Sequence, residues 1–84
     1  MGIAERKERE KEQRRITILD AAETLFFSKG IQQTTMDEIA QRAELSKGTL
    51  YLYFNSKSDI QFAVFQRGAD ILTDMMRAAI SETN

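Results

Sequence analysis

The chain contains neither cysteine nor histidine. It therefore has no disulfides, no zinc site of the usual ligand sets and no nucleophile activated by histidine. Its four glycines, at positions 2, 30, 48 and 68, form neither of the glycine-rich motifs that bind nucleotide phosphates. These absences argue against an enzyme, and we expect no cofactor and no bound metal.

Long hydrophobic runs are also missing. No apolar stretch approaches the about 20 residues that a membrane-spanning helix needs. The first residues, MGIAERKERE, lack the apolar segment of a secretory signal. With 84 residues, 42% of them hydrophobic and 30% charged, the chain is expected to form one small domain with a thin core. We expect no membrane association and a cytoplasmic location.

Charge is distributed unevenly along the chain, although the net charge is only −1. Residues 46–57 hold two lysines and no acid, and residues 1–15 hold six Lys or Arg against four Glu. The segments 16–45 and 58–84 are net acidic. Binding to nucleic acid depends on a local positive region and not on the total charge, so residues 46–57 are a candidate.

The spacing of apolar residues and the absence of proline predict an all-α fold. The clearest helix covers Gln13–Lys29, with one apolar stripe between Ile18 and Phe26 and Gly30 in the usual position after a helix end. Residues 1–13 are a charged N-terminal arm or an extension of this helix. The basic residues near its end either remain in solvent or contact DNA; they are Lys11, Arg14 and Arg15.

Two short helices are expected next. Thr35 and Glu38 have the spacing of a capping box, which begins a helix that ends near Arg42. Another helix begins at Ser46 after a turn of about three residues, which is the spacing of a helix-turn-helix. An αα-corner that binds no nucleic acid shares this pattern.

The fourth helix is expected from Lys57 to about Ser81, with Ser56 as its N-cap. Its second half carries more apolar surface than the first three helices can cover. We infer that a missing C-terminal domain, a second subunit or both would cover it. The alternative is a helix that frays after Gly68.

Successive residues of the third helix are about 100° apart around its axis. Leu50 and Phe54 then face the core, and the opposite side carries a glycine and no acid. We expect that side to lie in the major groove of DNA, where Gly48 allows close approach, Lys47 reaches guanine acceptors or a phosphate, and the tyrosines reach phosphates. Lys57 would add a phosphate contact.

Simpler interpretations of the same residues stand beside this one. In these interpretations, Tyr53 lies partly in the core, Gly48 is merely tolerated at the start of a helix, and Lys57 is an ordinary surface lysine. A competing hypothesis is a protein-protein interaction module that docks its partner through the exposed Tyr and Leu side chains of the third helix.

The chain resembles the N-terminal DNA-binding domain of TetR family transcriptional regulators. The resemblance lies in ILDAAETLFFSKG (18–30), TTMDEIAQRAELSKGTLYLYF (34–54) and NSKSDI (55–60). It implies a helix-turn-helix domain over residues 14–57 and a fourth helix, 58–84, that leads to an absent ligand-binding and dimerisation domain. Such proteins bind palindromic operators as homodimers at the bacterial nucleoid, usually as repressors released by a small-molecule effector. Together with the geometry of the third helix, the resemblance gives the expected DNA-binding residues, which are Thr35, Met36, Ser46, Lys47, Gly48, Thr49, Tyr51, Leu52, Tyr53 and Lys57.

One departure from the family pattern concerns the turn between the second and third helices. Glu44 stands where the family usually has glycine. This residue must adopt or avoid a left-handed conformation, at some cost in either case. Leu52 lies at a position that varies in the family, so its base preference does not follow from the resemblance.

Overall fold

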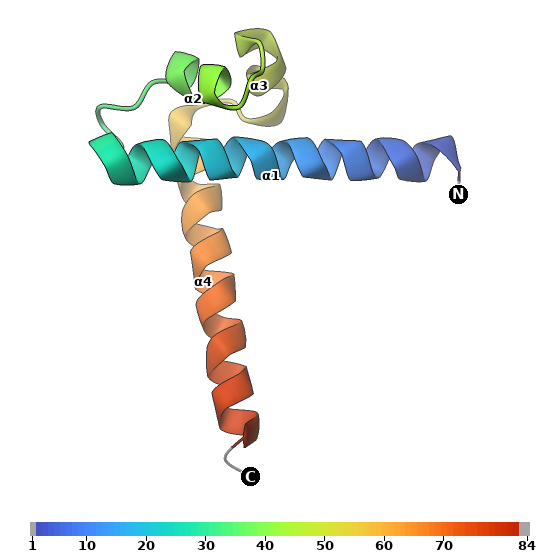
Figure 1. Cartoon of the computed structure of the whole chain (residues 1–84), viewed down its shortest axis with the longest axis vertical. Helices are drawn as coiled ribbons and strands as arrows, with labels where there is room; N and C mark the ends of the chain where they lie inside the picture. Colours follow the sequence, from blue (N-terminus) through green and yellow to red (C-terminus); the bar gives the residue numbers. More distant parts are fainter. Residues whose placement is uncertain (1, 83–84) are drawn as a thin grey trace.

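The computed structural model describes residues 2–82 and consists of four helices over that range. They are α1 (Ile3–Lys29), α2 (Met36–Arg42), α3 (Lys47–Tyr53) and α4 (Lys57–Glu82). Figure 1 shows α1 and α4 crossing at a steep angle, with α2 and α3 packed on one side of α1 and the greater part of α4 extending from the other side. The predicted all-α fold with a helix-turn-helix is confirmed.

Helix α1 begins well before the segment with the clear apolar stripe. The helix begins at Ile3 and includes the charged N-terminal segment. This first part of α1 extends past the other helices (Figure 1). Its buried residues lie in the middle of the helix, at Ile18, Leu19, Ala21 and Ala22. The helix ends where the sequence predicts, because Gly30 has a φ of 87°, a conformation that glycine adopts without strain.

The hydrophobic core lies where all four helices meet. Helix α1 contributes its middle residues, α2 contributes Ile39 and Ala40, α3 contributes Leu50, and α4 contributes Ile60 and Ala63. Phe54 is also buried, directly after α3. The prediction that Leu50 and Phe54 hold the third helix to the core is therefore confirmed, and the opposite side of α3 is turned away from it.

Both expected caps of the helix-turn-helix are present. The Thr35 hydroxyl accepts from the backbone N–H of Glu38 at 3.1 Å, and the Glu38 carboxylate accepts from the backbone N–H of Thr35 at 3.1 Å. The Ser46 hydroxyl accepts from the backbone N–H of Thr49 at 3.1 Å. Since each cap satisfies amides that the helix itself leaves unpaired, these short helices start at defined residues.

Glu44 adopts the left-handed conformation, with a φ of 58°. Its backbone N–H donates to the carbonyl of Gln41 at 3.1 Å, and the N–H of Leu45 donates to the carbonyl of Ala40 at 2.9 Å. These are the two hydrogen bonds of a Schellman motif, and Leu45 packs against the core beside it. The turn therefore has the geometry that glycine normally supplies, and Glu44 bears the strain.

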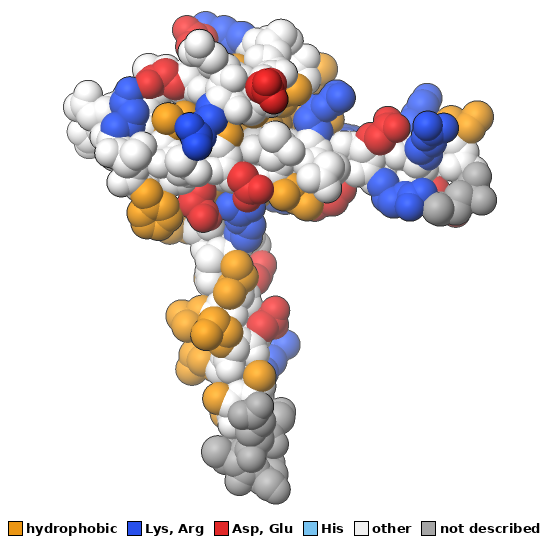
Figure 2. Space-filling view, viewed as in Figure 1, with side chains coloured by type: hydrophobic (Ala, Val, Ile, Leu, Met, Phe, Trp, Pro, Cys, Tyr) orange, Lys and Arg blue, Asp and Glu red, His pale blue; other side chains and the backbone are white. Residues whose placement is uncertain are grey.

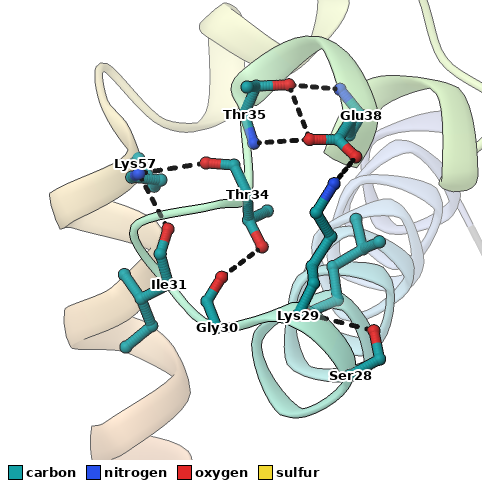
Figure 3. A network of polar contacts seen from close by, with 9 residues as sticks. Ser28, Lys29, Gly30, Ile31, Thr34, Thr35, Glu38 and Lys57 are labelled. Atoms are coloured by element: carbon teal, nitrogen blue, oxygen red, sulfur yellow. Dashed lines mark hydrogen bonds and ion pairs between the residues drawn. The ribbon is translucent and has the colours of Figure 1, made fainter.

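The start of α4 is joined to the loop between α1 and α2. The Lys57 ammonium donates to the carbonyl of Ile31 at 2.8 Å and to that of Thr34 at 3.0 Å. The buried Thr34 hydroxyl donates to the carbonyl of Gly30 at 2.8 Å. Figure 3 shows the Lys57 side chain reaching across to this loop. These bonds fix the loop that leads into the helix-turn-helix.

A second connection joins α4 to α1. The Arg67 guanidinium donates to the carboxylates of Asp20 and Glu23, each at 2.8 Å. Arg67 is partly buried, with 27% of its side chain exposed, whereas Asp20 and Glu23 are 66% and 43% exposed. These ion pairs fix the crossing of α1 and α4.

The greater part of α4 carries apolar side chains that are exposed. Figure 2 shows them gathered along the segment that extends away from the other helices. Within residues 2–82, no helix is both long enough and apolar enough to span a membrane. The large apolar side chains of α4 that are exposed include Phe62, Phe65, Ile71, Leu72, Met75, Met76 and Ile80.

Candidate nucleic-acid interface

The outward side of α3 is the candidate interface. Leu52 is 84% exposed and Tyr51 is 41% exposed, whereas Leu50, on the other side, is fully buried. A methyl group added at Gly48 would meet no heavy atom within 4 Å. The fold therefore does not require glycine at this position, and its presence on the outward side needs another explanation.

Two of the expected contact residues also form the cap of α3. The Ser46 hydroxyl accepts from the Thr49 backbone and donates to the Thr49 hydroxyl at 2.8 Å. The Thr49 hydroxyl keeps its own O–H to donate, because here it serves as the acceptor. Ser46 thus positions Thr49 at the start of the helix.

An acid from α2 lies beside the lysine of α3. The Lys47 ammonium is 3.1 Å from a carboxylate oxygen of Asp37, and both side chains are well exposed, at 59% and 70%. The hydrogen bond from Lys47 to Asp37 and the negative charge of Asp37 raise the pKa of Lys47. Helix α3 itself carries no acid, as expected, but the surface around Lys47 is not free of negative charge.

The start of α2 presents one exposed and one half-buried candidate. Thr35 is exposed, and its hydroxyl both accepts from the Glu38 amide and donates to the Glu38 carboxylate at 3.1 Å. Met36 is half-buried and packs against the core. Glu38 in turn accepts a hydrogen bond from Lys29, which together with the Thr35 bonds lowers the pKa of its carboxyl group, although the partial burial of Glu38 opposes this shift.

Lys57 and Tyr53 have structural contacts that the sequence only partly suggested. Two of the three N–H groups of Lys57 donate to loop carbonyls, a role that sequence reasoning missed. Tyr53 is half-buried and packs against the core, in line with the simpler interpretation. Contact of either residue with DNA stays a prediction.

The charged first part of α1 lies close to the end of α3. A groove between them is lined by acidic and basic residues of α1 and by two residues of α3. The Arg15 guanidinium lies 5.9 Å from the centre of the Phe54 ring, a cation–π contact that ties this part of α1 to the core. The lining residues are Glu8, Lys11, Glu12, Arg15, Leu52 and Tyr53.

Two capped helices joined by a Schellman turn, with the second helix exposed along one side, form a helix-turn-helix. The sequence profile described as "Bacterial regulatory proteins, tetR family" matches residues 18–64, which is more than half of the chain. The chain belongs to this family of transcriptional regulators, whose members are not enzymes.

Several curated relatives are similar to the chain. It is 41% identical over 73 residues to the HTH-type transcriptional activator FasR of Mycolicibacterium smegmatis, an alignment that covers 87% of this chain and 33% of FasR. It is 30% identical over 80 residues to the HTH-type transcriptional regulator TtgR of Pseudomonas putida, covering 95% and 38%. It is 31% identical over 74 residues to a fatty acid metabolism regulator protein of Bacillus subtilis, covering 88% and 38%. The chain thus spans between a third and two fifths of the length of these relatives.

Proposed function

We propose that the chain binds double-stranded DNA sequence-specifically, with α3 in the major groove, to regulate transcription. The observation that carries the proposal is the exposed side of α3, where Lys47, Gly48 and Leu52 are turned away from a core held by Leu50 and Phe54. An exposed helix with a cation, hydroxyl groups and one missing side chain suits contact with base edges and phosphates.

Each side chain has a chemical role in this proposal. Lys47 donates to a guanine or a phosphate, and Thr49 donates its hydroxyl to a base. Leu52, which is almost fully exposed, contacts the methyl group of a thymine. The phenol O–H groups of Tyr51 and Tyr53 donate hydrogen bonds to phosphate oxygens. These contacts set the depth of α3 in the groove and do not read the base sequence.

The full-length protein is proposed to act as a homodimer on a palindromic operator. A helix-turn-helix reads only a few base pairs, and two copies reading half-sites about one helical turn apart give a site of useful specificity. The exposed apolar side chains of α4 support this, because a surface of that kind is normally covered by another part of the protein or by a second subunit.

We further propose repression that is relieved by a small-molecule effector, bound in a separate C-terminal domain of the full-length protein. The matched region covers only 33% of FasR and 38% of TtgR, which leaves room for such a domain in these relatives. A domain seated on an operator excludes other proteins from the same duplex, so repression needs no further contact. The relative FasR is named a transcriptional activator. Transcription from an operator template with purified polymerase would show whether this protein represses or activates. We propose a cytoplasmic location, at the chromosome.

Selection of bound sequences from a random duplex pool tests the proposal. The expected result is an enriched motif that binds far more tightly than random duplex, with a log K that falls linearly with log salt. Lys47→Ala should weaken binding to the enriched duplex, and Arg77→Ala, which removes an exposed cation of α4, should not. Salt-insensitive binding of a protein through Tyr51 and Leu52, without any DNA preference, would instead support an interaction module.

A further inference from the structure

The ion pair between α2 and α3 belongs neither to the core nor to the caps of these helices, and the proposed contacts use only its lysine. Asp37 is the second residue of α2, and Lys47 is the first residue of α3. Their side chains meet at 3.1 Å although both are well exposed. The cap of α2 is already complete, because Thr35 and Glu38 exchange hydrogen bonds with each other's backbone. Asp37 therefore takes no part in the side-chain hydrogen bonds that cap α2.

A carboxylate at this place opposes DNA binding in general. It neutralises the basic residue with which α3 begins, so Lys47 contributes less to the attraction of phosphates than an unpaired lysine would. Non-specific affinity arises almost entirely from cations that displace counterions from phosphates. An acid paired with Lys47 therefore lowers affinity for every duplex by an electrostatic amount that does not depend on sequence.

The same pair favours one specific contact. A free lysine loses side-chain entropy when its ammonium is fixed, and Asp37 has already restricted Lys47 before DNA arrives. An ammonium has three N–H donors, so the bond to Asp37 leaves two for a base or a phosphate. Where the operator places a hydrogen-bond acceptor within reach of those two donors, Asp37 lowers the affinity for the operator less than it lowers the affinity for random DNA.

We propose that Asp37 is a positioning residue that acts through Lys47 and raises the ratio of operator to random-duplex affinity, mainly by weakening random binding. The inference rests on the proposed function, since it concerns how the same surface selects its DNA. It assigns to α2 a role in specificity that requires no contact between α2 and a base.

Four variants of the chain test the inference: Asp37→Asn, Lys47→Gln, the double variant, and Asp59→Asn as a matched control. Asp59 is an exposed acid in the first turn of α4, so its replacement makes the same change in net charge at a similar helix position. Fluorescence anisotropy would measure binding to a random-sequence duplex and to the duplex selected above, at several salt concentrations. Thermal unfolding of each variant would be recorded in parallel.

Asp37→Asn is expected to bind random duplex about three- to tenfold more tightly at 0.1 M salt, with a log K–log salt slope steeper by about 0.9. Its affinity for the selected duplex should rise less, so the ratio falls. In the Lys47→Gln background the same replacement should change little, and Asp59→Asn should leave both affinities unchanged.

Several results would overturn the inference. Equal tightening by Asp37→Asn with and without Lys47 would show direct repulsion of phosphate, and no change in random binding would show an incidental surface pair. If Asp37→Asn fails to fold, Lys47→Gln still tests the inference. The inference expects Lys47→Gln to change the slope of log K against log salt for random duplex by much less than about 0.9. A change of the full amount would contradict it. Failure of the proposed function is distinct, because the wild-type chain would then show no preference for the selected duplex.

Discussion

Replacing Gly48 by alanine should make the chain more stable and at the same time weaken its binding to DNA. Gly48 lies in α3 with a negative φ, and an added methyl group would meet no heavy atom within 4 Å. Glycine within a helix is about 0.5–1 kcal/mol less favourable than alanine. For a domain of this size, about 1 kcal/mol raises Tm by about 4–8 °C.

DNA binding should change in the opposite direction. The added methyl group projects from the outward side of α3 and would hold the helix further from the duplex. Losing one charge-assisted hydrogen bond to a phosphate in this way costs about 1.5–3 kcal/mol, which is roughly ten- to a hundredfold in affinity. Circular dichroism would give Tm, and fluorescence anisotropy with the selected duplex would give the affinity.

Gly68→Ala is the matched control, because Gly68 is also helical and exposed with open space around its Cβ position. It should raise Tm by a similar amount and leave DNA affinity unchanged. If Gly48→Ala binds the selected duplex as tightly as the wild-type chain, close approach is not the reason for the glycine. The reasoning about α3 would then be refuted.

Three further changes test the fold around the interface. Glu44→Gly should stabilise the chain by about 0.5–1 kcal/mol in urea unfolding, because relief of left-handed strain exceeds the entropy that glycine gains on unfolding; Glu44→Ala should give no such gain. Lys57→Met should cost about 1–2 kcal/mol, because two loop carbonyls lose a charged donor, and unchanged stability would contradict this role. The pKa of Glu38 is lowered mainly by Lys29. The stability that the Glu38 carboxylate contributes is therefore present above the unfolded-state pKa and is lost as pH falls through the lower folded-state pKa. Glu38→Gln should flatten the dependence of Tm on pH in that range, and an unchanged slope would refute the assignment.

Local patterns in the sequence were sufficient for the helices and their ends. The Thr35–Glu38 capping box, the Ser46 cap and Gly30 each act within about four residues, and they lie where the sequence predicts. The burial of Leu50 followed from helix periodicity for the same reason. These features depend on spacing along the chain, which a sequence displays directly.

Contacts between distant segments did not follow from the sequence. Lys57 bonds to carbonyls 23 and 26 residues away, and Asp37 meets Lys47 across the turn. Long flexible side chains reach many positions, so only the packed helices decide which partner they meet. The conformation of Glu44 was likewise left open, because the residue type disfavours the left-handed region that the Schellman hydrogen bonds require.

The most direct test of the central claim is to observe which residues the DNA contacts. Titration of the ¹⁵N-labelled chain with the selected duplex, followed by amide chemical shifts, would locate the surface. We predict the largest shifts from Ser46 to Tyr53 and at the start of α2, with small shifts along the apolar side of α4. Shifts concentrated on α4, with α3 unaffected, would contradict the account.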